Sequence, residues 1–271
     1  MQSGYAAALL RETARLYFTK RVSRGAAAMS YFLLLTVFPL LICLNAMLGS
    51  LFPTAERFEA FARGILPQQT LGAVSDYLRY VSAYSGRGML TAGLALTCTT
   101  AAAAFRATHN VMADLRGKPR FRPLLSWPLS FLFSLLLPAA VYFAALAVLL
   151  GERLLQVLSM HFAFLDPARL FAALRYPLLF LLMFLLLWGL YRVTAPPDSR
   201  RGLAPGALAA SAGIELLSAA FSAGIGMSAR YALVYGSLTS LIMLLLWLYF
   251  FCTLVILGGA LNAAAQKLRM K

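Results

Sequence analysis

Apolar residues along this chain gather into six long runs, each near or above the roughly 20 residues that a helix needs to cross a bilayer. The runs occupy residues 27–51, 89–111, 125–150, 171–192, 203–224 and 236–263. Polar and basic residues are concentrated in the segments between them. The pattern predicts an all-α fold, a polytopic transmembrane helix bundle of about six spans within residues 26–265.

Two of the six runs carry many small residues. Ala and Thr dominate 89–111, and 203–224 is rich in Ala, Gly and Ser. Such helices usually pack inside a bundle, because small side chains let backbones approach closely. We expect Gly206, Ala210 and Gly213 to form a contact of this kind.

The segments outside the runs predict further helices. Residues 1–25 form a predicted amphipathic helix, with an approximate apolar stripe on one side and basic residues on the other. It lies on the cytoplasmic membrane surface, or it is a solvated leader helix that packs on the bundle. The external loop 52–88 has apolar spacings typical of two short amphipathic helices, separated near Pro67. Residues 266–271 form a basic cytoplasmic tail.

Basic residues set the predicted orientation. Fifteen of the 24 lysines and arginines fall in the N-terminal segment, the second and fourth loops and the tail, which share one side of the membrane. Eight fall in the loops of the opposite side. Because basic loops stay on the inner side, both termini are predicted to be cytoplasmic.

Composition supports the membrane assignment. Hydrophobic residues make up 61% of the chain and charged residues 12%, against about 45–50% and 25% in soluble domains. A soluble fold of this size could not bury so much apolar surface. The formal net charge of +15 fits basic helix ends at a membrane better than nucleic-acid binding. The predicted partners are therefore membrane lipids, anionic headgroups among them, and not nucleic acid.

Glu215 is the one acidic residue within the six predicted runs. A charge at the bilayer centre costs about 2.5–3.5 kcal/mol on insertion scales, so this carboxyl is expected to face the bundle interior. It is a candidate for binding a proton or a substrate. The alternative is a structural hydrogen bond between helices.

Further polar candidates lie in the first two runs. Arg106, His109 and Asn110 share a helix face, because they are three and four residues apart. They could bind an anionic headgroup or pair with Glu215. The alternative is that Arg106 extends to the cytoplasmic interface and His109 ends the helix. Asn45 is a candidate for the same pathway or for a hydrogen bond between helices.

Catalytic and cofactor motifs are missing from the sequence. The two histidines, His109 and His161, lie far apart, and the nine acidic residues are scattered, so no metal-binding pattern emerges. No Walker A loop or G-x-G-x-x-G motif occurs. The sequence therefore predicts no enzyme, no cofactor and no metal site.

Several short motifs follow one another along the runs. The first reads A-M-S-Y-F-L-L-L-T-V-F-P-L at 28–40, and the next read F-R-A-T-H-N at 105–110 and L-Y-R at 190–192. The last read Y-G-S-L at 235–238 and L-W-L-Y at 246–249. In this order they resemble the YihY/BrkB family of bacterial inner-membrane proteins, formerly mislabelled as ribonuclease BN. The motif residues are Tyr31, Phe38, Pro39, Tyr235, Gly236 and Trp247.

The resemblance implies a multi-pass protein of the bacterial cytoplasmic (inner) membrane. The family has no agreed reaction, and its members are associated with cell-envelope integrity and with suspected transport of lipids or small solutes. The family commonly has an acidic residue after a Leu-Gly-Ala in the last helix. Here residues 257–260 read L-G-G-A without that acid, so any role it has elsewhere is not carried over.

The sequence and the resemblance lead to one leading hypothesis of function. The protein is a transporter or translocator of a lipid or small polar solute, with Glu215 as the coupling carboxyl and Arg106 and Asn110 near the pathway. The alternative is a non-transporting scaffold for envelope integrity, in which the small-residue faces of the second and fifth runs pack together or form a homo-oligomer. A membrane-tethered nuclease is a remote alternative.

Overall fold

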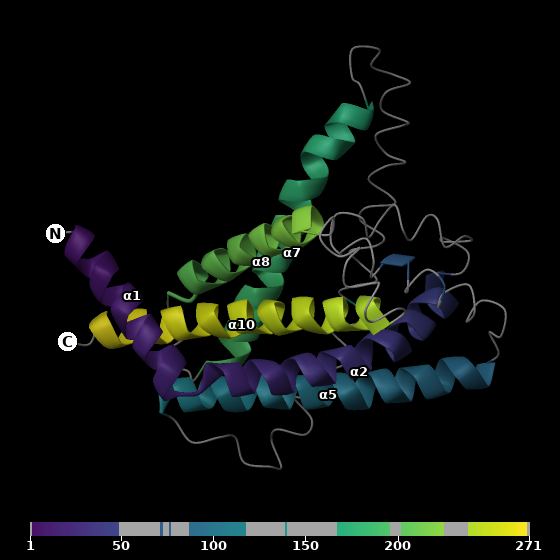
Figure 1. Cartoon of the computed structure of the whole chain (residues 1–271), viewed down its shortest axis with the longest axis horizontal. Coiled ribbons are helices and arrows are strands. Elements are labelled where there is room, and N and C mark those ends of the chain that lie inside the picture. The colour runs from purple at the N-terminus through teal and green to yellow at the C-terminus, as the bar shows by residue number, and fades with distance from the viewer. Residues whose placement is uncertain are drawn as a thin grey trace.

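The computed structural model describes residues 2–48, 71–72, 76, 87–117, 139, 167–195, 202–224 and 238–269. Long helices account for nearly all of these residues, which confirms the predicted all-α class (Figure 1). They are α1 (Gln2–Thr19), α2 (Val22–Leu48), α5 (Arg87–Arg116), α7 (Pro167–Thr194), α8 (Ala204–Gly224) and α10 (Leu238–Arg269).

Four of these helices contain a segment long and apolar enough to cross a membrane. The segments are Val22–Leu41, Pro177–Thr194, Ala204–Ala223 and Leu238–Arg269. They fall in the first, fourth, fifth and sixth predicted runs. α5 covers the second run but is less apolar, because Ala and Thr fill much of it. The third run and the predicted helices of the first external loop lie almost wholly outside the described residues.

A short turn at Lys20 and Arg21 separates α1 from α2. Arg21 has a φ of 52°, and its N–H donates to the Phe18 carbonyl at 3.4 Å. This left-handed residue ends α1 and turns the chain. α2 then begins at Val22, so the break between the helices comes before the boundary predicted at residue 25.

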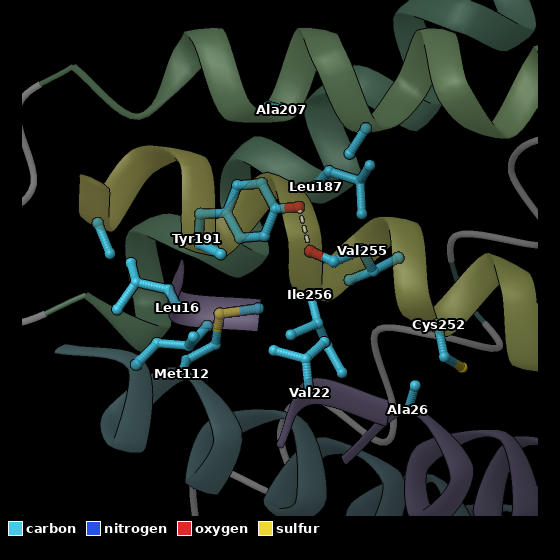
Figure 2. Packing of buried hydrophobic residues seen from close by; sticks show 14 of the residues in the cluster. Leu16, Val22, Ala26, Met112, Leu187, Tyr191, Ala207, Cys252, Val255 and Ile256 are labelled. Carbon is cyan, nitrogen blue, oxygen red and sulfur yellow. Dashed lines mark hydrogen bonds between the residues drawn. The ribbon is translucent and has the colours of Figure 1, made fainter. Parts of the chain in front are cut away.

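α10 is the central helix of the described bundle. It packs against α8, α2, α1 and α5, and it lies between α8 and the α2–α5 pair in Figure 1. All six helices contribute to one cluster of buried apolar residues around it. Figure 2 shows Val255 and Ile256 of α10 among Val22, Met112 and Leu187 from three other helices. The fold therefore depends on how closely its neighbours approach α10.

Two adjacent glycines let three helices approach α10. A Cβ atom at Gly258 would lie 2.5 Å from the Gly206 carbonyl oxygen of α8 and would overlap the Tyr191 hydroxyl of α7. A Cβ atom at Gly259 would overlap the Met112 side chain of α5. One glycine therefore makes room for α7 and α8, and the next makes room for α5.

The close contact predicted for the small residues of the fifth run is confirmed, and its partner is α10. Gly206 and Ala210 both lie against Gly258, and Gly213 faces Leu254. This packing occupies the small-residue face of α8. It differs from the hypothesis that the fifth run packs on the second, because α10 stands between α8 and α5 (Figure 1).

α2 and α5 form a second tightly packed pair. A Cβ atom at Gly25 would overlap the Val111 side chain, and the Thr108 hydroxyl lies 3.1 Å from the Met29 sulfur. α2 remains helical through Pro39, as membrane helices tolerate when their surroundings satisfy the freed carbonyl.

Replacing Gly206 with Ala is expected to lower stability by about 1–3 kcal/mol, the usual cost of overpacking a close contact. The added methyl group would overlap the Gly258 carbonyl oxygen, a backbone atom that cannot rotate away. Thermal unfolding of the detergent-solubilised protein measures the change. Gly189→Ala is the matched control, because a Cβ atom there meets no atom within 4 Å. Equal melting temperatures of the two variants would contradict the close crossing of α8 and α10.

Candidate functional site

A ridge of polar side chains runs along α8. Ser211, Glu215, Ser218 and Ser222 are four, three and four residues apart, which places them on one face of the helix. Ser211 is fully buried, Ser218 is half-buried, and Glu215 and Ser222 are exposed. Polar and ionisable groups in a membrane helix are functional candidates by default. These four residues, the α8 polar ridge, form the candidate site.

The ridge begins beside the face that α8 buries on α10. Ala207, Ala210 and Ile214 form that buried face, and Ser211 lies next to them. The Ser211 hydroxyl is buried and has no hydrogen-bond partner among the described residues. A buried hydroxyl without a partner costs about 1–3 kcal/mol.

Glu215 lies where the described helices leave α8 uncovered. Its side chain is exposed, whereas the sequence predicts that it faces the bundle interior. No ion pair or hydrogen bond of the described residues joins Glu215 to Arg106. The physical reason is the position of α10, which lies between the helices that carry these two residues (Figure 1).

Asn262 of α10 fixes the first turn of α8. Its Oδ1 accepts the Gly206 N–H at 2.9 Å, and its Nδ2 donates to the Leu203 carbonyl at 2.9 Å. Leu203, which precedes the helix, has no side-chain oxygen to cap it, and Pro205 has no N–H. Asn262 therefore supplies from another helix the cap that the local sequence lacks.

Tyr191 joins α7 to the same part of α10. Its side chain is fully buried, and its hydroxyl donates to the Val255 carbonyl at 2.6 Å (Figure 2). The ring fits there because Gly258 has no side chain. Two hydrogen-bonded side chains, Asn262 and Tyr191, thus set where α7 and α8 lie on α10, and with them the position of the α8 polar ridge.

Arginine side chains gather at one end of the bundle. Arg116 at the end of α5 donates from Nη1 to the Thr194 carbonyl of α7 at 3.3 Å. Its Nε and Nη2 are buried without a hydrogen-bond partner in the described part of the chain. Arg192 lies over the Trp188 ring, 5.1 Å from the centroid. The basic residues of the sequence predict that this end of the bundle is cytoplasmic.

The other predicted site residues lie on α5 and α2. His109 is buried, with its ring centroid 6.4 Å from that of Phe105, while Arg106 and Asn110 are half-buried. Asn45 belongs to α2, but its side chain lies outside the described part of the structure. No described hydrogen bond or ion pair joins any of them to Glu215, so the α8 polar ridge is a site of its own.

The sequence assigns no packing role to Asn262, Tyr191 or Arg116, although Tyr191 belongs to the L-Y-R motif at 190–192. A signal exists for Asn262, which is an amide inside the sixth apolar run, where polar side chains usually bond a neighbouring helix. A second signal is the spacing of the serines around Glu215. For Arg116 the sequence shows only a basic residue that follows an apolar run. The burial of its guanidinium results from the packing of the helices and cannot be read from the sequence.

Comparison with known families identifies the family of this chain. A family model described as virulence factor BrkB matches residues 13–271, which include nearly all of the described helices. The chain belongs to the BrkB family. This result confirms the resemblance that the motifs suggest, and it fixes the protein as a membrane protein of that family.

Two BrkB relatives show how far the similarity extends. YfkH of Bacillus subtilis, named a ribonuclease-like protein, is 27% identical over 271 positions, which cover 95% of each chain. The UPF0761 membrane protein NMB0524 of Neisseria meningitidis serogroup B is 28% identical over 259 positions. That match covers 92% of this chain but 61% of the longer Neisseria protein. No solved structure matches the chain.

The BrkB motif residues of the described helices have different environments. Trp247 is buried, with its ring stacked on Phe251 at 5.5 Å, so it packs inside the bundle. Pro39 is buried in α2, whereas Tyr31 and Phe38 are exposed. Tyr235 and Gly236 lie outside the described residues.

Replacing Asn262 with Leu is expected to destabilise the protein by about 2–4 kcal/mol, because each backbone group left buried without a partner costs about 1–3 kcal/mol. Thr253→Val is the matched control on the same helix. The Thr253 hydroxyl donates only within α10, to the Tyr249 carbonyl at 2.8 Å, so its loss should change stability by about 0.5 kcal/mol or less. Thermal unfolding in detergent compares the two. A variant at Asn262 as stable as the control would show that α8 does not need this cap.

Proposed function

We propose that this BrkB-family protein is a transporter or translocator of a lipid or small polar solute in the bacterial inner membrane. Glu215 is the carboxyl that binds the substrate or carries a proton. The observation that supports the proposal is the α8 polar ridge, which sets a carboxyl and three hydroxyls along one face of an apolar helix.

A polar ridge on a membrane helix requires polar surroundings. A charged group at the bilayer centre costs about 2.5–3.5 kcal/mol, and burial against a polar ligand or a water-filled path reduces that cost. A headgroup or a solute that moves along α8 would meet Glu215 and Ser222, the exposed residues of the ridge, in succession. Apolar residues such as Leu216, which is 72% exposed, flank the ridge and suit lipid tails.

Contacts with α10 hold the backbone of α8 in place beneath this ridge. Asn262 clamps the helix at Gly206, and the crossing with Gly258 holds the same end. Glu215 lies about two and a half turns further along the helix, beyond this clamp. Substrate contacts at Glu215 therefore form on a helix whose position is already set by α10.

The proposed orientation places both termini in the cytoplasm. Lys267 near the end of α10 bonds Glu12 of α1, which sets the two terminal helices on the same side of the bundle. The excess of basic residues in the segments on that side supports its cytoplasmic placement.

Flux measurements on the reconstituted full-length chain test the role of Glu215. Proteoliposomes with a fluorescent phosphatidylglycerol report lipid translocation by loss of fluorescence on adding dithionite, and trapped pyranine reports proton movement. Glu215→Gln keeps the shape of the side chain but does not titrate, so it should reduce the flux at least tenfold, as expected when a coupling group is lost. Glu215→Asp is the matched control that keeps a carboxyl, and it should retain part of the flux.

The outcomes distinguish the functions in play. Equal flux by Glu215→Gln and the unchanged protein, at equal thermal stability, would contradict the role of this carboxyl. No lipid or proton flux above protein-free vesicles would favour the envelope scaffold. The described residues contain no cluster of three or more His, Cys, Asp or Glu side chains that could hold a metal.

A further inference from the structure

A pocket lies where α1 crosses the C-terminal end of α10. It has a volume of about 680 Å³ and is lined by Ala7, Ala8, Arg11, Glu12, Arg15 and Leu268. Two arginines therefore face an open space at the junction of the two terminal helices. The pocket is separate from the α8 polar ridge and from every residue assigned to that site.

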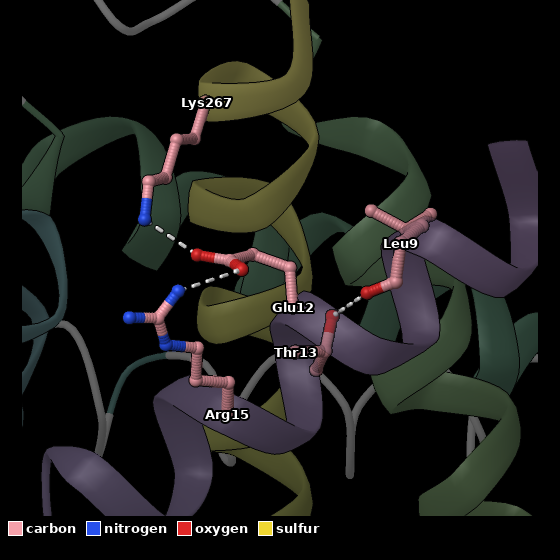
Figure 3. Close-up of polar contacts among 5 residues, drawn as sticks. All are labelled: Leu9, Glu12, Thr13, Arg15 and Lys267. Atoms are coloured by element: carbon pink, nitrogen blue, oxygen red, sulfur yellow. Dashed lines mark hydrogen bonds and ion pairs between the residues drawn. The ribbon is translucent and has the colours of Figure 1, made fainter.

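An ion pair sets the geometry of this pocket. The Glu12 carboxylate accepts a hydrogen bond from Lys267 Nζ at 2.5 Å, and its other oxygen lies 3.8 Å from Arg15 Nη1 (Figure 3). The Glu12 side chain is only 17% exposed, whereas that of Arg15 is 73% exposed. Lys267 is thus a closer partner of the carboxylate than Arg15, and the Arg15 guanidinium remains largely exposed to an anion.

Arg11 adds a second cation one turn away on α1. It is exposed and has no ion-pair partner among the described residues. Arg11, Arg15 and Lys267 against the single acid Glu12 leave an excess of positive charge around the pocket. Charge complementarity therefore favours an anionic occupant.

The height of the pocket relative to the bilayer follows from α10. The helix carries no charged residue from Leu238 to Ala265, and then carries Gln266, Lys267 and Arg269. Leu268 lines the pocket, and Lys267 beside it bonds Glu12 of the lining, both at the first polar turn after the uncharged stretch. It therefore lies at the boundary between hydrocarbon and headgroups, where lysines and arginines meet lipid phosphates.

An apolar ridge lies beside the two arginines. Leu10, Ala14 and Phe18 are four residues apart on the outer side of α1, and all three are exposed. The exposed fraction is 65% for the Leu10 side chain and 76% for the Phe18 side chain. Large apolar side chains that are exposed side by side often mark a surface that contacts a membrane or another molecule. A helix with a row of arginines next to a row of apolar side chains matches a lipid, whose phosphate and tails lie side by side.

We propose that this pocket binds a phospholipid with an anionic headgroup from the leaflet that surrounds this end of the bundle. Arg11 and Arg15 hold the phosphate, and the lipid tails cover Leu10 and Phe18. The bound lipid joins α1 to the end of α10 together with the Glu12–Lys267 pair. The site is independent of transport, since it uses no residue of the α8 polar ridge.

Native mass spectrometry of the full-length protein in detergent tests the site directly. Phosphatidylglycerol and phosphatidylcholine with identical tails are titrated separately, and retained lipid is counted. Phosphatidylglycerol should be retained preferentially. The double substitution Arg11→Gln/Arg15→Gln should weaken its binding roughly 5-fold for each arginine, about 25-fold for the pair.

The matched control removes the same charge nearby. Lys20→Gln/Arg24→Gln changes two exposed basic residues that do not line the pocket, and it should leave phosphatidylglycerol binding within about twofold of the unchanged protein. Leu10→Ser/Phe18→Ser keeps the arginines and should weaken retention of the lipid by removing contacts to its tails. Thermal unfolding of each variant shows whether the fold is intact.

Three results would overturn the proposal. An equal loss of binding in both charge variants would mean general attraction to a basic end of the bundle. Full displacement of phosphatidylglycerol by inorganic phosphate, with no effect of Leu10→Ser/Phe18→Ser, would assign the pocket to a soluble anion. Equal retention of phosphatidylcholine and phosphatidylglycerol would remove the role of the headgroup charge. None of these results bears on the flux expected for Glu215.

Discussion

The crossing of α8 and α10 at Gly206 and Gly258 is the contact on which the described bundle depends. Inside a bilayer, the surrounding lipid is as apolar as the helix surfaces, so association relies on close packing and hydrogen bonds between helices. The glycines bring the backbones together, Asn262 caps α8 from α10, and Tyr191 bonds the backbone of the same helix. These contacts lie close together on α10, so each helps to hold the helices at the distance that the others need.

That crossing explains the shape of the candidate site. With its small residues committed to α10, α8 can present one polar side elsewhere, and Glu215 lies on that side. The same packing separates α8 from α5, since α10 stands between them, so a pair of Glu215 with Arg106 does not form. The α8 polar ridge and the basic side chains of α5 are therefore two separate features of the bundle.

The C-terminal part of α10 serves a second purpose. Over about two and a half turns it carries Gly258, which meets α8, then Asn262, which caps α8, and then Lys267, which bonds Glu12 of α1. A helix that holds the core at one turn and α1 shortly after ties the interior of the bundle to its N-terminal helix. The proposed lipid site at α1 and the proposed pathway at α8 are thus anchored to one helix while using different residues.

Several features were determined by the sequence itself. Long apolar runs fix an α-helical membrane bundle, because only structures that satisfy their own backbone groups can cross lipid. The small residues of the fifth run indicate a close contact, and the motifs indicate the BrkB family, to which the chain belongs.

Other features required the tertiary structure. The sequence around Gly206 does not indicate which helix packs against it. Asn262 and Leu203 are 59 residues apart in the chain, so their hydrogen bond depends on the tertiary fold. Which polar side chains are bonded, exposed or buried follows from distances between helices, and a local pattern carries no information about those distances.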